Sequence, residues 1–473
     1  MTWPTHAVEA AIVAIYLLLA LLVTIDVLLK KNDVRAALGW IAAAWLSPIL
    51  GSLLYYMFGI NRVTRRALKL GKRQRRQARR APHGAEPVAS PNIAILANVG
   101  QKLAENPLTP GNHITALESG DAAYAAMLGA IAGAKNSIAM ASYIYRDDAA
   151  GRIFTEALAA AQKRGVAVRV LLDGVGTGYF FSAAFRRLKR AGLPVARFLH
   201  TWVPWRMPFL NMRNHRKFLV IDGSRAFTGG MNIAAEHSGR LAKGAPISDI
   251  HFQIDGPVVR SIMDAFARDW TFTTEELLDA EHWWPAIEEQ GPVQARGLRS
   301  GPDADLYKIE MLAGAALNLA RKHIRIVTPY FLPDQRLQFA IAQATMRGVR
   351  VDIVLPLRSD HRYMEWAMMG HLRFFHHVGA NVFLSPPPFD HSKLLTMDGE
   401  WCLIGSSNWD TRSFRLNFEY DLECYDRDLT GLLDAIIERK IAAARKLDPA
   451  ELLRRPVPAR LRDAAARLLM PYL

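Results

Sequence analysis

The chain has 473 residues, with 59 Lys or Arg against 44 Asp or Glu, a formal net charge of +15 and a pI near 9.9. The basic excess indicates an anionic partner, which on charge alone is a lipid surface or a nucleic acid. The two cysteines, Cys402 and Cys424, exclude a disulfide framework and show no metal-ligand spacing, and they are compatible with a reducing cytoplasm.

The N-terminal region contains two long apolar segments. Ala10–Ile25 is uncharged and continues past Asp26 to Leu29, and Ala36–Ile60 is also free of charge. Because both segments are long enough for a membrane helix and only a short link separates them, we expect a membrane helical hairpin over residues 1–60. A cleaved signal peptide fits poorly, since no basic region precedes the first segment. A buried soluble hairpin remains as an alternative, as does a hairpin that dips into one leaflet, because Asp26 and Pro48 weaken a full crossing.

A basic juxtamembrane linker is expected over residues 61–95. Between Arg62 and Arg80 it carries ten Lys or Arg and no acid. A solvated linker helix or a nucleic-acid arm has the same composition. Directly after a membrane segment, however, such a run favours contact with anionic membrane lipids and places the rest of the chain in the cytoplasm.

The chain that follows the basic run contains strand and helix patterns that occur twice. Residues 138–143 and 164–172 are strand-like and enclose a helical stretch, and residues 324–330 and 347–355 repeat this order. The alternation predicts an α/β fold in which helices cover a largely parallel or mixed sheet. We expect a first half over residues 96–290 and a second half over residues 291–473.

A short motif occurs in each half at the same spacing. His215, Lys217 and Asp222 stand at positions 0, +2 and +7, and Gly229 and Asn232 follow at +14 and +17. The second copy has identical intervals and consists of His391, Lys393, Asp398, Gly405 and Asn408. One short match arises easily by chance, but two with the same downstream Gly and Asn do not. The repeat predicts one site built from two halves.

Both motifs are expected to lie on β-hairpins. Residues 218–221 and 394–397 are apolar runs, an Asp-Gly turn signal follows each, and residues 226–228 and 401–404 are typical of return strands. Because residues i and i+2 share one face of a strand, the His and the Lys of each motif should point the same way. The return strand should bring the Asn beside them.

These residue types suit a phosphodiester. Lys217, Lys393, Asn232 and Asn408 offer donors for non-bridging oxygens, and two histidines can divide the work of nucleophile and general acid/base. A nucleophilic imidazole needs an acceptor on its other nitrogen. Asp249, downstream of His215, and Glu419, downstream of His391, are candidates for this orienting role. No sequence cluster suggests a metal, so we predict a covalent mechanism without metal or cofactor.

Two further stretches have apolar character. Residues 202–210 (WVPWRMPFL) precede the first motif and are typical of an interfacial lip, with an ordinary buried loop as the alternative. The basic, Leu-rich tail over residues 460–473 suits either a membrane-surface helix or a helix that caps the second half.

The duplicated His-x-Lys-x4-Asp motif resembles the signature of the phospholipase D superfamily. Over almost its whole length the chain resembles the bacterial cardiolipin synthases within it. The stretches that carry this resemblance are Trp40, Pro48, Gly51 and Tyr55–Gly59 in the hairpin, 142–145 with Asp148 and Gly151, 213–217, 301–303, 328–331, 391–393, 407–413 and 416–419.

The resemblance implies two phospholipase D-like α/β/α halves that share one active site, and a phosphatidyl transfer between two phosphatidylglycerol molecules. His215 would form the phosphatidyl-histidine and His391 would act as acid and base. The choice of His215 as nucleophile comes from its position in the superfamily motif, because the sequence itself is nearly symmetric. The resemblance also implies that Asp222 and Asp398, counted here with the catalytic residues, chiefly support local structure, and that Asp249 and Glu419 orient the imidazoles.

Three functions remain open from the sequence. A membrane-bound phospholipase D hydrolase, or a transferase with another donor such as phosphatidylethanolamine, would use the same residues. A nuclease of the superfamily could use the basic run, but the hairpin and the apolar lip argue against it. We therefore expect a lipid substrate, a location at the bacterial inner membrane and no nucleic-acid partner.

Overall fold

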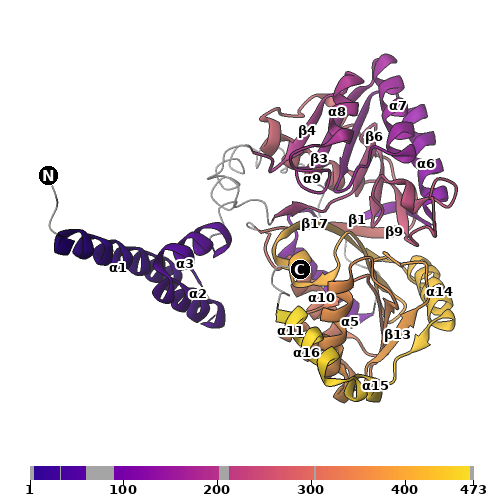
Figure 1. The fold of residues 1–473 in the computed structure, drawn as a ribbon. Coiled ribbons are helices and arrows are strands. Elements are labelled where there is room, and N and C mark those ends of the chain that lie inside the picture. The colour runs from indigo at the N-terminus through magenta and orange to yellow at the C-terminus, as the bar shows by residue number, and fades with distance from the viewer. Residues whose placement is uncertain (1–4, 32–33, 60–89, 202–211, 303–304, 469–473) are drawn as a thin grey trace. The chain divides into compact units, whose positions relative to one another are not determined.

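The computed structural model describes residues 5–31, 34–59, 90–201, 212–302 and 305–468, which form two compact units. Of the described residues, 5–31, 34–59 and Thr201 belong to the first unit, and 90–200, 212–302 and 305–468 belong to the second (Figure 1). The expected interfacial lip over residues 202–210 and most of the basic linker lie outside the described residues.

The first unit contains α1 (Thr5–Lys30), α2 (Val34–Leu46), α3 (Pro48–Leu54) and the π-helical turn η1 (Tyr55–Gly59). Among the described residues, α1 is the one helix long and apolar enough to cross a membrane. The expectation of a second full-length helix over residues 36–60 is wrong, because the segment breaks at Ser47. The proline that follows has no N–H to donate, so Pro48 starts a new helix at its first position.

In its described residues, the second unit is built on one mixed sheet of 16 strands (Figure 1). Its strands before residue 291 are β1 (Thr109–Leu117), β2 (Ser137–Ser142), β3 (Ala167–Asp173), β4 (Val195–Phe198), β5 (Arg213–Asn214), β6 (Phe218–Ile221), β7 (Arg225–Gly229) and β8 (His251–Asp255). Those after it are β9 (Val293–Ser300), β10 (His323–Val327), β12 (Arg350–Pro356), β13 (Asn381–Ser385), β14 (Leu394–Met397), β15 (Trp401–Gly405), β17 (Asn417–Tyr425) and β18 (Arg445–Lys446). A separate two-stranded sheet pairs β11 (Phe331–Leu332) with β16 (Trp409–Asp410).

The strand order displays the duplication that the sequence predicted. From one edge it runs β4-β3-β2-β6-β7-β8-β1, and from the other it runs β13-β12-β10-β14-β15-β17-β9 after the short edge strand β18. In both series the first three strands are parallel and the following neighbours are antiparallel. The series meet where β1 pairs with β9. The division at residue 290 itself stays a prediction, although it falls between these two central strands.

Helices cover both faces of the sheet. Those of the first series are α6 (Gly120–Gly133), α7 (Ala149–Lys163), α8 (Ala183–Arg190) and α9 (Val259–Thr274). Helices α6 and α7 contact the sheet through one apolar core, and α9 contacts it through another. Those of the second are α10 (Lys308–Leu319), α11 (Gln335–Met346), α12 (Arg362–Leu372), α13 (Thr411–Arg415), α14 (Arg427–Ala443), α15 (Pro449–Arg454) and α16 (Val457–Leu468). The predicted α/β/α layering is therefore present.

Two helices lie where the sequence left their place open. Helix α5 (Pro91–Leu103) spans the expected boundary between linker and first half, yet Ile93 and Leu96 belong to the core of the second half. Helix α16 packs on α12, where a Cβ added at Gly370 would lie 2.7 Å from the backbone oxygen of Asp463. The described part of the C-terminal tail thus caps the second half.

Candidate active site

The two motif hairpins are present at the predicted positions. Strand β6 follows Lys217 and turns through Asp222 and Gly223 into β7, and β14 does the same after Lys393 into β15. All four strands are almost wholly buried, so the backbone that carries each His and Lys is held by the sheet on both sides.

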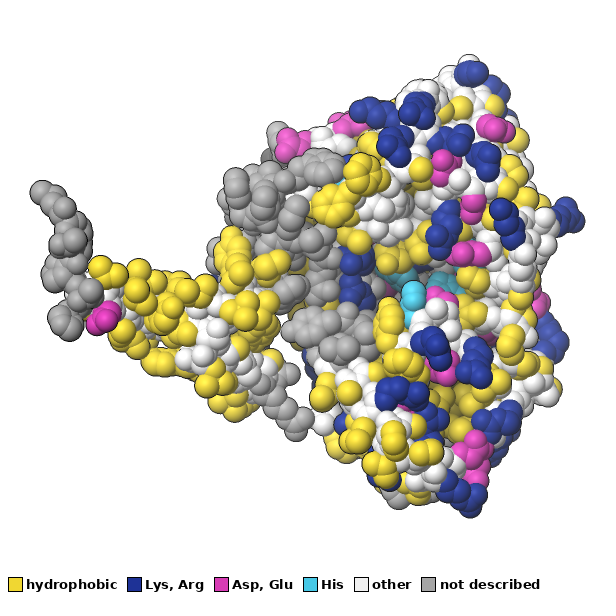
Figure 2. All heavy atoms as spheres, viewed as in Figure 1, with side chains coloured by type: hydrophobic (Ala, Val, Ile, Leu, Met, Phe, Trp, Pro, Cys, Tyr) yellow, Lys and Arg dark blue, Asp and Glu magenta, His cyan; other side chains and the backbone are white. Residues whose placement is uncertain are grey.

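The two motif histidines, one from each half, line one cavity of about 460 Å³. Figure 2 shows histidine side chains in a hollow of the second unit with basic side chains on its rim. The cavity is lined by polar residues from both halves, among them Tyr143, Arg213, His215, Asn232, Glu236, His237, Tyr330, Asp360, His391, Asn408, Asp410 and Arg412. The structure thus brings the predicted His and Asn residues together at one site.

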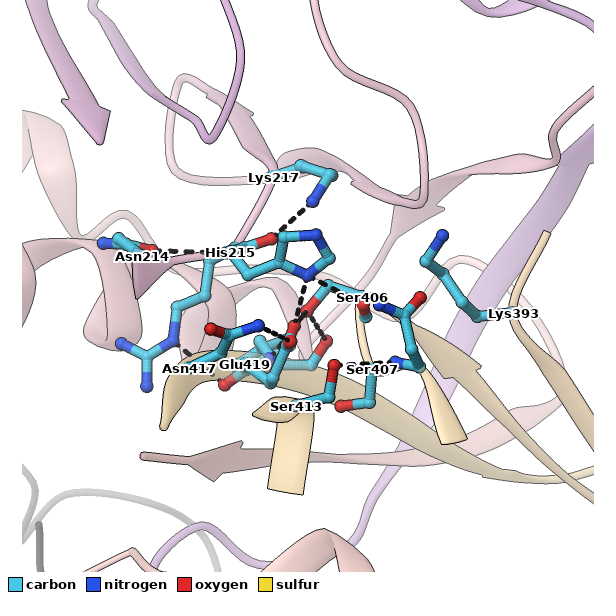
Figure 3. A network of polar contacts seen from close by, with 12 residues as sticks. Asn214, His215, Lys217, Lys393, Ser406, Ser407, Ser413, Asn417 and Glu419 are labelled. Atoms are coloured by element: carbon cyan, nitrogen blue, oxygen red, sulfur yellow. Dashed lines mark hydrogen bonds and ion pairs between the residues drawn. The ribbon is translucent and has the colours of Figure 1, made fainter. Parts of the chain in front are cut away.

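Each histidine is hydrogen-bonded to an acid of the other half. His215 Nδ1 lies 2.9 Å from Glu419 Oε2, and His391 Nδ1 lies 2.8 Å from Asp249 Oδ2 (Figure 3 shows the first pair). Both carboxylates are fully buried. The acids predicted to orient the imidazoles do contact them, but each contacts the histidine of the other half and not the one that precedes it in its own half.

This contact fixes which nitrogen can react. Because a carboxylate accepts a hydrogen bond, it holds the proton on Nδ1 and leaves the lone pair of Nε2 available. Burial, reinforced by the nearby charges of Lys217 and Lys393, lowers the pKa of His215 well below its usual range. The neutral imidazole is therefore the stable form of His215 in the free site.

The surroundings of the two acids differ. Glu419 also accepts from the Ser406 hydroxyl at 2.6 Å and, through Oε1, from the Asn417 amide at 3.1 Å (Figure 3). Asp249 accepts from its neighbouring backbone N–H at Ile250, and a Cβ at Gly230 would lie 2.5 Å from Asp249 Oδ1. Ser406 and Gly230 hold the same place after the two return strands, so the sequence repeat could have indicated this asymmetry.

Both lysines are buried beside the histidines. Lys217 Nζ donates to the backbone oxygen of His215 at 2.6 Å, and Lys393 Nζ donates to that of His391. Burial lowers the pKa of Lys217 to about 7 and that of Lys393 to about 8, while Glu419 and Asp249 act in the opposite direction. The site therefore holds cations that an entering anion would stabilise.

The two asparagines are positioned by the loops that follow the return strands. Asn232 Oδ1 accepts from the Ile144 backbone at 3.2 Å, which leaves the Asn232 amide nitrogen for a ligand. The Asn408 backbone N–H donates to Ser413 Oγ, and the buried Oδ1 of Asn408 has no hydrogen-bond partner among the described residues. A substrate that enters the cavity can supply the hydrogen-bond partner that this buried amide oxygen lacks.

The motif aspartates do not lie beside the histidines. Asp222 follows the far end of β6 and accepts from the backbone N–H groups of Lys135, Asn136 and Ser137. Asp398 does the same after β14 with residues 321–323. Counting these two with the catalytic residues is corrected accordingly: they occupy left-handed turn positions, with φ of 49° and 55°, and anchor the strands of the hairpins.

One group of potential metal ligands occurs in the described residues, and it lies away from the cavity. His323, Asp352 and Glu438 place ligand atoms within 4.8 Å of one another near the start of β10. Arg350 contacts Asp352, and Arg325 contacts Glu438, so basic side chains already compensate the acids. This arrangement is an ion-pair network between β10, β12 and α14.

Comparison with known proteins agrees with the geometry. Residues 127–270 and 314–441 match the family described as "Cardiolipin synthase, PLD-like domain", and residues 18–59 match one described as "Phospholipase_D-nuclease N-terminal". The major cardiolipin synthase ClsA of Bacillus subtilis is 29% identical over 99% of this chain and 100% of its own length. Cardiolipin synthase A of Pseudomonas fluorescens is 31% identical over 98% of both chains.

A solved structure shares the fold. The crystal structure of phosphatidylserine synthase from Haemophilus influenzae covers 80% of this chain and 100% of its own, with a TM-score of 0.63 and 17% identity. At this identity the likeness concerns the fold alone.

Proposed function

The chain belongs to the cardiolipin synthase family of phospholipase D-like proteins, and we propose that it transfers a phosphatidyl group from one phosphatidylglycerol to another, giving cardiolipin and glycerol. The observation that carries this proposal is the pair of exchanged contacts, His215 with Glu419 and His391 with Asp249, across one cavity. Two imidazoles with their Nδ1 atoms engaged can act on one phosphorus from opposite sides.

In the first step His215 Nε2 attacks the phosphorus of the donor lipid. A P–N bond forms, the P–O bond to glycerol breaks, and His391 gives a proton to the leaving oxygen. Burial and the nearby Lys393 and Lys217 charges lower the pKa of His391 in the free site, and an anionic diester beside it offsets those charges. Substrate binding thereby favours the protonated acid that this step needs.

In the second step the terminal hydroxyl of another phosphatidylglycerol replaces glycerol. His391 takes its proton, the alkoxide attacks phosphorus, the P–N bond breaks and cardiolipin leaves. The three donors that hold Glu419 keep His215 in one tautomer through both steps, which supports His215 as the nucleophile. Lys217, Lys393 and the two site asparagines stabilise the charge that develops on the non-bridging oxygens.

A membrane location supports transfer over hydrolysis, because the acceptor lipid is concentrated at the bilayer and water is scarce there. Helix α1 is long and apolar enough to anchor the chain in a membrane. We place the catalytic unit on the cytoplasmic side, because the basic run over residues 62–80 follows the apolar segments.

Product analysis tests this function. The detergent-solubilised full chain is incubated with phosphatidylglycerol labelled in its phosphate, and cardiolipin, glycerol and phosphatidic acid are measured. We expect cardiolipin and glycerol in equal amounts, lost in His215→Ala and kept in His113→Ala, which changes an exposed histidine of β1. Phosphatidic acid alone would make the protein a hydrolase, and a reaction only with phosphatidylethanolamine would change the donor.

A further inference from the structure

Two arginines from different halves face the same cavity. Arg213 lies on β5, which pairs in parallel with β17 at Asn417, and Arg412 lies on α13. Tyr143 lines the same cavity as the two arginines and His215. Its ring centre is 4.9 Å from that of His215, and its hydroxyl is hydrogen-bonded to Arg213. The arginines therefore belong to the cavity but not to the His/Lys/Asn sets.

The arginines add positive charge that the first reaction step does not need. The cationic forms of Lys217 and Lys393 are balanced by Glu419 and Asp249 within the site. After burial, the charge of Arg213 is the main influence that lowers the pKa of Arg412, so the two guanidinium groups repel each other.

Asp173 and Asp410 act to raise the pKa of Arg412, so these two acids already offset part of the guanidinium charge. Asp173 accepts from the N–H groups of residues 175, 176 and 214, and Asp410 caps α13 through the Ser413 N–H. An anion between the guanidinium groups would relieve their repulsion, and planar guanidinium groups bind phosphate oxygens in pairs.

The proposed reaction supplies such an anion. The donor has one phosphodiester, which the lysines and asparagines hold at His215, and the acceptor brings a second one, three carbons from its attacking hydroxyl. We propose that Arg213 and Arg412 bind the phosphodiester of the acceptor lipid. This inference rests on the proposed function and assigns the acceptor subsite within it. It explains how the site can prefer an anionic lipid alcohol to water or a neutral alcohol.

Competition between acceptors tests the subsite. The full chain in mixed micelles receives labelled phosphatidylglycerol and equal concentrations of two soluble alcohols, glycerophosphoglycerol, which keeps the acceptor's phosphodiester, and ethanol, which lacks it. We expect wild type to favour glycerophosphoglycerol. The ratio of the glycerophosphoglycerol product to the ethanol product should fall about tenfold or more in Arg412→Gln and Arg213→Gln. Arg225→Gln is the matched control, since Arg225 pairs with Asp255 at the far end of β7.

The ratio separates this subsite from a general loss of activity. An unchanged ratio in active variants overturns the proposal, whether both rates fall or neither does. If either Gln variant fails to fold, Arg412→Lys and Arg213→Lys give the same comparison with charge retained and paired geometry lost. Absence of any preference in wild type also overturns the subsite. Wild type that transfers to ethanol but makes no cardiolipin would instead refute the proposed function.

Independent contacts in the first unit bear on membrane topology. Tyr55 donates a hydrogen bond to Asp26 at 2.7 Å, and its ring centre is 5.5 Å from that of Trp40. In one straight helix, residues 40 and 55 would stand about 22 Å apart. A Cβ at Gly51 would lie 2.1 Å from the Ala43 oxygen, so α3 folds back along α2. The second apolar segment therefore returns to the end of α1 from which it started.

Length and charge agree with this reversal. Helix α1 is about 39 Å long and α2 about 20 Å, against a hydrocarbon core of about 30 Å. Residues 1–29 contain no Lys or Arg, whereas Lys30, Lys31 and Arg35 lie at the junction of α1 and α2, and the basic run over residues 62–80 follows α3. We infer that α1 crosses the bilayer once and that α2 and α3 enter and leave the cytoplasmic leaflet, so residue 2 and the catalytic unit lie on opposite sides.

Cysteine labelling in bacterial cells tests the topology. Both native cysteines are buried, so single cysteines at Thr2, Asn32 and Gly71 can be compared with a membrane-impermeant maleimide. We expect Thr2→Cys to react as soon as the outer membrane is permeabilised and the inner membrane is intact. We expect Asn32→Cys and Gly71→Cys to react only after the inner membrane is also opened. Reaction of Asn32→Cys from outside indicates two full crossings, and protection of all three indicates a hairpin that only embeds. Either result overturns the inference.

Discussion

Replacing Glu419 by Gln removes the charge that orients His215 while keeping the volume of the side chain. Glu419 is fully buried and accepts from the imidazole at 2.9 Å, from Ser406 at 2.6 Å and from Asn417 at 3.1 Å. A hydrogen bond to a charged group contributes about 1.5–3 kcal/mol. Because about 1.4 kcal/mol corresponds to a tenfold change in rate, we expect kcat to fall about 10- to 140-fold with little change in KM.

The pH profile of this variant separates orientation from simple destabilisation. Burial raises the pKa of Glu419 to about 7, so in wild type the carboxylate is lost as the pH falls through about 7. The acidic limb of kcat/KM should therefore lie near pH 7 and disappear in Glu419→Gln.

Glu310→Gln is the matched control for Glu419→Gln. Burial also raises the pKa of Glu310 to about 7, but Glu310 pairs with Arg336 and does not line the cavity. The assay is the initial rate of glycerol release from phosphatidylglycerol micelles between about pH 5 and about pH 9, a range that brackets both pKa values. An acidic limb that persists in Glu419→Gln, or an equal loss of kcat in Glu310→Gln, would show that Glu419 does not orient His215.

Three further expectations concern the lysines and the hairpin turns. Burial lowers the pKa of Lys217 to about 7 and that of Lys393 to about 8, so kcat/KM should fall as the pH rises through about 7 to about 8. Rates in mixed micelles that stay flat from about pH 7 to about pH 10 contradict this. Lys217→Met should lower kcat about 10²- to 10³-fold, as loss of one transition-state donor does, and a single-turnover rate within about threefold of wild type excludes that role. Asp222→Asn keeps a residue that tolerates a left-handed turn but weakens three backbone contacts, so the midpoint of thermal unfolding should fall by about 2–8 °C while kcat stays within about threefold. An unchanged midpoint, measured by circular dichroism, contradicts the anchoring role.

The hairpins could be predicted from the sequence because their signals are local. The apolar runs at 218–221 and 394–397 and the Asp-Gly turns match β6, β14 and their turns residue for residue. The break at Ser47 was equally local, since Pro48 marked it, but the absence of charge over residues 36–60 suggested one helix.

The exchange of acids between the halves could not be predicted in this way. It depends on long-range pairing between the halves, namely of β1 with β9, of β5 with β17 and of Ser248 with Asp390. The constant offset between the two motif copies indicates that the halves have similar folds, but it does not indicate how one half is oriented relative to the other. The packing of α5 in the second-half core could not be predicted either. Its apolar face would fit against the sheet of either half, and only the tertiary fold selects the second.

A phosphatidyl group bonded to His215 is the intermediate on which the proposed reaction depends. The full chain is mixed with phosphatidylglycerol labelled in its phosphate, quenched in base within the first turnover, digested and mapped by mass spectrometry. We expect base-stable, acid-labile label on the peptide that contains His215, appearing before cardiolipin and absent in His215→Ala. Label on His391, or cardiolipin formed at full rate with no labelled histidine, would exclude His215 as the nucleophile.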